Sequence, residues 1–290
     1  MGTLRFSPRV LLFMLPALAL YGVFFVLPFL RTLYYSVFDW NGFSEPSFVG
    51  LANYAELLQD ELFLRGVGRA ALWAALAVLL KVGSALVLAS MLRVPIPGSR
   101  FFTTAFFVPV VISSAAISLM FTLIYDLDVG LLNSLLRSIG LAAWTRSWLG
   151  DENTALLAVI AVPVWHTIGY FLVILLAAMQ GVPKELYESA EIDGAGSWTI
   201  FSRITVPMVW GTLQVCVVLA ITAAFKSFDY VFVMTRGGPG TSTQVPATYM
   251  FETIFVGLKF GYGTTIATAI FVIGLVTTIV FRRLTRSKLH

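Results

Sequence analysis

Six stretches of mainly apolar residues alternate with polar segments along the chain. A helix needs about 20 such residues to cross the hydrocarbon core of a bilayer. The pattern therefore predicts six membrane-spanning helices, at roughly Val10–Leu30, Ala70–Leu92, Phe102–Ile124, Thr154–Met179, Val206–Phe225 and Thr264–Phe281. The first stretch is longer than the roughly 7–15 apolar residues of a signal peptide, so we expect it to be retained as a helix.

Composition supports a membrane protein. Hydrophobic residues make up 58% of the chain and charged residues 12%, whereas soluble domains have about 45–50% and about 25%. The fold class we predict is all-α, with lipid as the solvent for much of the surface. Cys216 has no second cysteine to pair with, and His166 and His290 alone cannot build a metal site. The chain contains no phosphate-binding G-x-x-x-x-G-K-[ST] loop for ATP.

Lys and Arg are denser on one side of the predicted membrane. That side holds Arg5 and Arg9, the segments 93–100 and 181–205, and the C-terminal tail. The positive-inside rule places this side, with both termini, in the cytoplasm. The cations flank the spans and do not gather in one patch, which argues against nucleic acid as a partner.

An acidic segment, ELYESAEIDGAGSWTIF, separates the fourth and fifth predicted spans. Glu185, Glu188 and Glu191 recur every three residues, so they share one face of a predicted helix. Gly194 can break that helix by adopting a positive φ, and Ser197 is a suitable N-cap for a second helix. The segment is therefore predicted to form a helix–glycine–helix elbow on the cytoplasmic side.

The elbow has two interpretations, which differ in the charge they require. A connector lying among lipid headgroups would carry basic residues, because anionic lipid attracts them. The first helix is acidic, so a protein groove with basic or amide donors is a better partner for it. We therefore expect the elbow to dock a cytosolic protein.

The elbow resembles the EAA loop of binding-protein-dependent ABC importer permeases. That loop reads Glu-Ala-Ala, three residues, Gly, nine residues, Ile-x-Leu-Pro. The chain has Glu188-Ser189-Ala190, then Gly194, then Ile204-Thr205-Val206-Pro207 at the same spacing. Ser189 and Val206 depart from the pattern, whereas Asp193 and Ala195 match its common Asp-Gly-Ala form. The segments LANYAELL, FFVPVVIS, FDYVFVMTRGGPGTST and LKFGYGTTIAT extend the resemblance to the sugar-permease branch over nearly the whole chain.

The resemblance implies a type I ABC importer transmembrane fold with a cytoplasmic coupling helix in a prokaryotic inner membrane. Its parts would be a first helix with an extracytoplasmic loop (1–66), a five-helix core (67–284) and a tail (285–290). Implied partners are a second, homologous permease, two cytosolic ATPases that bind ATP and Mg, an extracytoplasmic solute-binding protein and lipid. The chain itself would hold no cofactor. Residues expected to contact the ATPase are Glu185, Glu188, Ser189, Ala190, Asp193, Gly194 and Ala195.

Several polar residues lie within or beside the predicted spans, where charge is costly and often functional. Lys81 and His166 each either make structural hydrogen bonds between helices or line a solute path. Lys226 either lines that path or pairs with Asp229 three residues later. The candidate path residues are Lys81, His166, Gln214, Thr222, Phe225 and Lys226, where polar groups and rings would suit a sugar.

No catalytic constellation emerges from the sequence. Ser113 and Ser114 have no nucleophile context, and small residues that permit close helix packing explain them better. The alternative function is an ion-coupled secondary transporter, which would need a carboxylate inside the membrane. No Asp or Glu lies centrally in the six predicted spans, so a non-enzymatic importer permease is favoured. The sequence does not name the solute.

Overall fold

The computed structural model describes residues 8–94 and 97–286, with side chains for 13–94 and 97–285. Arg5 and the tail residues 287–290 lie outside the described part, so their predicted cytoplasmic location stays a prediction. The chain divides into two compact units, one of residues 1–60 and 250–271 and one of 61–249 and 272–290. Each unit is described by itself. The predicted boundaries at 66 and 284 stay predictions.

The first unit is built from the N-terminal helix and the start of the last one. Its elements are α1 Pro8–Tyr21, the π-helical segment Gly22–Val26, α2 Leu27–Tyr35, β1 Phe38–Asp39, β2 Ser47–Phe48, α3 Ala52–Leu57, the π-helical segment Glu252–Val256 and the first part of α16 Phe260–Arg286. The strands pair antiparallel, with Phe38 opposite Phe48. The backbone carbonyl of Ser36 links the elements of this unit. It accepts a hydrogen bond from Thr265 Oγ1 on α16 at 2.9 Å and another from Asn53 Nδ2 on α3 at 3.1 Å.

The second unit holds the remaining helices. They are α4 Glu61–Leu76, the π-helical segment Ala77–Val82, α5 Gly83–Leu92, α6 Ser99–Phe107, α7 Ser114–Ile124, α8 Leu131–Ser138, α9 Ala155–Gln180, α10 Lys184–Ile192, α11 Ser197–Ile200, α12 Val206–Met208, α13 Trp210–Phe225, α14 Asp229–Met234 and α15 Pro246–Phe251, whose last two residues belong to the first unit. Short 3-10 turns, Val108–Val111 and Ala142–Trp144, and a π-helical segment, Phe201–Thr205, connect some of them.

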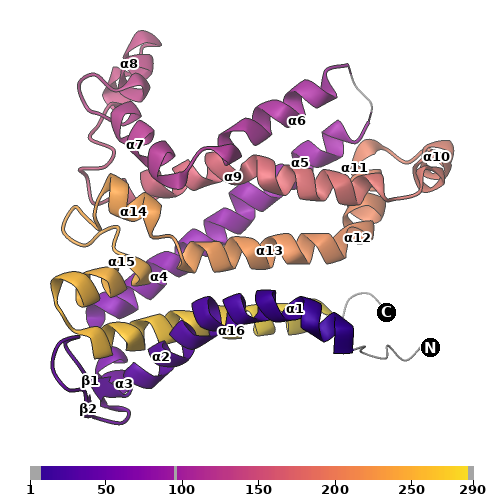
Figure 1. Ribbon diagram of the computed structural model, residues 1–290. Coiled ribbons are helices and arrows are strands. Elements are labelled where there is room, and N and C mark those ends of the chain that lie inside the picture. The colour runs from indigo at the N-terminus through magenta and orange to yellow at the C-terminus, as the bar shows by residue number, and fades with distance from the viewer. Residues whose placement is uncertain (1–7, 95–96, 287–290) are drawn as a thin grey trace. The chain divides into compact units, whose positions relative to one another are not determined.

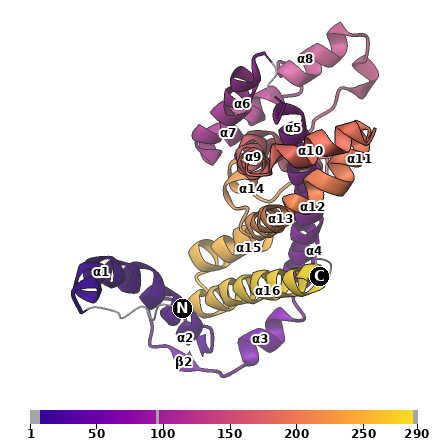
Figure 2. The same cartoon turned by 90° about the vertical axis from the view of Figure 1, so that its right-hand side faces the viewer.

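Helix α9 is the core of the second unit. Figure 2 shows it nearly end-on, with α5, α6, α7, α13 and α14 around it. Its buried residues, among them Val159, Phe171 and Leu175, lie on several sides of the helix, as expected for a helix packed all round. Gly169 permits the closest approach, because a β-carbon there would collide with the backbone carbonyl oxygen of Phe106 on α6. A small residue at such a crossing lets two membrane helices pack backbone to backbone.

Among the residues that the structure describes, four helices are long and apolar enough to span a bilayer: Phe13–Tyr35, Glu61–Leu92, Ala155–Gln180 and Phe260–Thr285. They match four of the six predicted spans, although the second begins nine residues before the predicted Ala70. Two further pairs qualify as one span each only if their bent halves are counted together. The third and fifth predicted spans are therefore present as two helices each, joined at a bend.

The bends have local causes. The third span turns by 98° between Val111 and Ser114. Ile112 and Ser113 are extended there, and Ser113 Oγ accepts the backbone N–H of Ala116 to cap α7. Ser113 is thus an N-cap, which corrects its assignment as a small packing residue. The fifth span turns by 76° at Val209, two residues after Pro207, where a missing N–H commonly bends a helix.

Candidate functional site

The elbow follows directly from the end of α9. Figure 1 shows α10 and α11 beyond the C-terminal end of that helix. Helix α10 ends in two capping bonds: the N–H of Gly194 donates to Glu191 O at 3.0 Å, and that of Ala195 donates to Ala190 O at 2.9 Å. This pair of bonds forms when the residue just beyond the helix end adopts the left-handed conformation. Gly194 has φ +78° and supplies it, so the predicted break occurs at the predicted residue.

Within the described helix α10, Tyr187 is the one buried side chain. Glu185, Glu188, Ser189 and Glu191 are exposed, as are Asp193 and Gly194 beyond the helix, whereas Ala190 and Ala195 are half-buried. Large apolar side chains lie among these acids, with Ile192 86% and Trp198 76% exposed. A surface that combines acids with exposed apolar groups is typical of a protein-binding site.

One detail of the elbow differs from the prediction. Gly196, and not Ser197, is the N-cap of α11, and no side chain caps this helix. The helix therefore begins at Ser197, one residue earlier than the prediction placed it, a difference within the usual uncertainty of helix ends.

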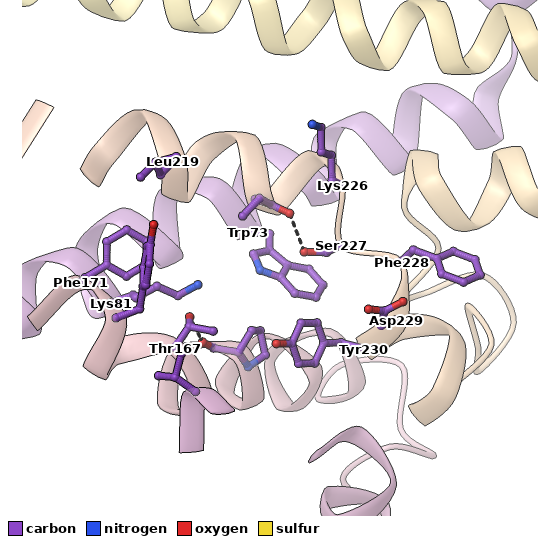
Figure 3. Close-up of a pocket in the computed structure, with 15 residues that line it drawn as sticks. Trp73, Lys81, Thr167, Phe171, Leu219, Lys226, Ser227, Phe228, Asp229 and Tyr230 are labelled. Carbon is purple, nitrogen blue, oxygen red and sulfur yellow. Dashed lines mark hydrogen bonds between the residues drawn. The ribbon is translucent and has the colours of Figure 1, made fainter. Parts of the chain in front are cut away.

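A cavity of about 390 Å³ opens between α9, α13, α14 and the second span. That volume is in the range of small-molecule sites. Figure 3 shows its lining, which combines aromatic rings with a few polar groups. The residues that line it are Trp73, Lys81, Val110, Pro163, Thr167, Tyr170, Phe171, Leu219, Ala223, Ala224, Lys226, Ser227, Phe228, Asp229 and Tyr230.

Lys81 is the buried amine of this cavity. It is 4% exposed, lies in the π-helical segment Ala77–Val82, and has its Nζ 5.6 Å from the centre of the Phe171 ring. Figure 3 shows its amine directed into the cavity. No carboxylate forms an ion pair with it in the described part of the chain. Single π-helical turns within α-helices often occur at functional sites.

The other predicted path residues are placed differently. Lys226 lines the same cavity, but it is exposed and its amine points away from the centre in Figure 3. Thr222 donates its hydroxyl to Val218 O of its own helix at 2.8 Å. Phe225 lines a separate pocket, which Ala71 and Phe281 also line. The residues that line the cavity of Lys81 do not include Gln214, Thr222, Phe225 or His166.

His166 instead joins three segments beside the cavity. Its Nε2 lies 3.0 Å from Ile112 O, and its Nδ1 lies 2.7 Å from the hydroxyl of Tyr230. A carbonyl can only accept, so in the neutral ring Nε2 carries the proton and Nδ1 accepts from Tyr230. The carbonyl of Ile112 has no helical partner because the chain bends there. His166 therefore supplies the partner that the bend removes.

Asp229 makes a second hydrogen bond to the segment that follows the bend of the third span. Ser114 Oγ donates to Asp229 Oδ2 at 2.5 Å, which ties α7 to the start of α14. The alternative in which Lys226 pairs with Asp229 is wrong: no ion pair joins them within the described residues. The reason is local, since α13 ends at Phe225 and the two residues do not share a helix.

Replacing His166 with Phe is expected to destabilise the protein by about 1–3 kcal/mol, because it leaves the Ile112 carbonyl without its buried partner. Chemical denaturation in mixed micelles measures this. Tyr230→Phe is the matched control: it removes one bond of the junction and keeps the bond to Ile112, so its loss is expected to be smaller. Equal losses for both variants would contradict the role given to the Ile112 bond.

Sequence reasoning missed several residues of the cavity. Trp73 precedes Lys81 by eight residues, and this helical spacing was a usable signal for a shared face. Thr167, Tyr170 and Tyr230 carried no signal separate from the apolar residues around them. Within the described residues, no three His, Cys, Asp or Glu side chains are arranged to hold a metal ion.

Comparison with known proteins identifies the family. Residues 82–290 match the family described as binding-protein-dependent transport system inner membrane component. A probable ABC transporter permease protein of Bacillus subtilis, YurN, is 40% identical over 91% of both chains. The diacetylchitobiose uptake system permease protein NgcF of Streptomyces coelicolor is 36% identical over 92% of this chain and 78% of its own.

The fold has also been seen in a solved structure. One chain of a bacterial alginate ABC transporter, crystallised in complex with an alginate pentasaccharide-bound periplasmic protein, superposes with a TM-score of 0.84. The superposition covers 97% of this chain and 95% of that one at 21% identity, so it shows the shared fold. With the family match and the relatives, it leads to one conclusion: this chain belongs to the binding-protein-dependent transport system inner membrane components, the permease subunits of ABC importers.

Proposed function

We propose that this permease forms the membrane path for a saccharide and that α10 is the helix through which separate ATPases drive it. The observation that carries the proposal is the exposed elbow beyond α9, with Gly194 at φ +78° and acids along α10. Its spacing is that of the EAA loop. In this proposal two cytosolic ATPase subunits bind ATP and Mg, and this chain supplies no catalytic group.

The elbow has the chemistry of a protein-docking surface. Ile192 and Trp198 expose large apolar area, which a protein groove would bury and thereby stabilise the complex by about 25 cal/mol per Å². Glu185 and Glu188 are exposed near the start of α10, where the helix dipole favours negative charge. The ATPase groove is expected to present basic or amide donors to them.

The cavity of Lys81 is the proposed section of the solute path in this subunit. Trp73, Phe171 and Tyr230 provide rings, and Thr167 and Lys81 provide hydrogen-bonding groups. A saccharide offers both kinds of surface, since its ring faces are weakly polar and its edges carry hydroxyls. Several relatives are named as permeases for diacetylchitobiose, lactose or starch degradation products, which supports a saccharide as the solute.

The remaining parts of the proposal follow from the importer architecture. The Lys and Arg pattern puts both termini and the elbow in the cytoplasm. A second, homologous permease completes the path, and an extracytoplasmic binding protein delivers the solute on the opposite side. The alginate transporter was solved with such a periplasmic protein, which supports a partner of this kind here.

The test is reconstitution of the chain with its encoded partners in proteoliposomes, with binding protein outside and ATP inside. Neutral and acidic saccharides from mono- to oligosaccharide length are offered in turn. One of them is expected to stimulate ATP hydrolysis and to accumulate in the vesicles. Uptake that proceeds without ATP under an ion gradient, or no stimulation by any saccharide, would overturn the proposal.

A further inference from the structure

The inner end of the second span reaches the elbow through one side chain. Helix α5 ends at Leu92, and Arg93 is its C-cap residue. The central carbon of the Arg93 guanidinium lies 3.5 Å from the centre of the Tyr187 ring on α10. This distance is that of a guanidinium stacked flat on a ring, a contact that Arg makes and Lys cannot reproduce.

Tyr187 is also what anchors α10. It is 6% exposed, while the other described side chains of the helix are exposed or half-buried. Tyr187 is therefore the described side chain of α10 that packs most deeply against the rest of the unit. Beside the stack lies a pocket of about 420 Å³, lined by Met179, Val182 and Lys184 among others.

The stack, and not a hydrogen bond, joins the two residues. Arg93 Nε and Tyr187 Oη are both buried, and neither has a hydrogen-bond partner within the described part of the chain. The contact energy must then come from the ring face and the guanidinium plane. The hydroxyl of Tyr187 contributes little to this joint, a point that a single-atom substitution can test.

The second span connects this joint to the solute cavity. The helix Glu61–Leu92 carries Trp73 and Lys81, which line that cavity, and Arg93 follows its last residue. We propose that the stack of Arg93 on Tyr187 is the mechanical joint through which movement of α10 reaches the second span, making both positioning residues for transport. The inference rests on the proposed function, because it assumes that an ATPase moves α10.

The experiment measures solute transported per ATP hydrolysed by the whole assembly in proteoliposomes. Tyr187→Leu and Arg93→Met are each expected to lower this ratio roughly fivefold to thirtyfold, which spans the loss of an exposed to a desolvated cation–π contact. Tyr187→Phe keeps the ring and is expected to stay within about twofold of the unmutated assembly. Arg93→Lys keeps the positive charge but not the planar guanidinium, so its ratio of solute to ATP is expected to lie between those of Arg93→Met and the unmutated assembly.

Controls separate the joint from general damage. Arg203→Met removes an exposed basic residue from the same cytoplasmic segment and is expected to leave the ratio unchanged. Co-purification of the ATPases shows whether each variant assembles, and Arg93→Met tests the joint without altering α10. The double variant Tyr187→Leu with Arg93→Met is expected to be no worse than either single variant, since one contact is lost only once.

The outcomes are distinguishable. An unmutated assembly that shows no ATP-driven uptake overturns the proposed function, and the joint with it. Normal uptake together with normal ratios in Tyr187→Leu and Arg93→Met overturns the joint alone. A Tyr187→Phe variant as impaired as Tyr187→Leu also overturns it, because the hydroxyl and not the ring face would then carry the effect.

Discussion

Replacing Gly194 with proline is expected to lower solute transport at least about tenfold, the equivalent of roughly 1.4 kcal/mol, while the assembled ATPases continue to hydrolyse ATP. Gly194 has φ +78°, and proline fixes φ near about −65°. The substitution also removes the N–H that donates to Glu191 O. Helix α10 would then leave the elbow in another direction, so the contact that we propose between it and an ATPase would no longer move the spans.

Two further variants test the cause of that loss. Gly196→Pro places the same residue two positions later, where φ is already −70°, and is expected to transport nearly normally. Gly194→Ala keeps the N–H but strains a left-handed position by about 1–2 kcal/mol, so an intermediate loss is expected. Uptake per ATP is the measurement. Normal transport by Gly194→Pro would show that the bend has no role in coupling.

The second large effect concerns Lys81, for which the sequence left two interpretations open. Replacing Lys81 with Met, of similar length, is expected to lower transport about tenfold or more, because the cavity loses its buried amine. The same variant is expected to unfold at higher denaturant concentration. A lysine at the centre of a span costs about 2.5–3.5 kcal/mol on insertion scales, and no carboxylate offsets that cost here within the described residues.

The direction of the stability change separates the two interpretations. If Lys81 served structural hydrogen bonds, its removal would destabilise the protein. Lys226→Met is the matched control, since Lys226 lines the same cavity but is exposed with its amine directed away. The free energy of unfolding of Lys226→Met is expected to change by less than about 0.5 kcal/mol. A Lys81→Met variant that is less stable and still transports normally would contradict a solute role.

The elbow was predictable because its determinants are local. The spacing of Glu185, Glu188 and Glu191 needs only helical geometry, and Gly194 is the residue that tolerates the left-handed conformation of the break. The four long spans were predictable for the same reason, since a run of apolar residues meets the length requirement of the bilayer by itself.

The bends and the cavity depend on contacts distant in sequence. Pro109 and Pro207 were visible signals for the two bends, but hydropathy does not report an angle. His166 could be singled out as a polar residue in a span, yet its partners Ile112 and Tyr230 are 54 and 64 residues away. Thr222 and Gln214 lie on α13, which ends one residue before Lys226, and periodicity alone did not show that other residues of that helix line the cavity.

A photo-cross-linking amino acid at Ser189, which is exposed on α10, tests whether this helix contacts an ATPase subunit. The assembled importer in native membrane is irradiated, with the same group at exposed Leu135 on α8 as the control. We expect an adduct between Ser189 and an ATPase subunit, and none from Leu135. An adduct of Ser189 with lipid alone, or no adduct while the assembly transports solute, would contradict it.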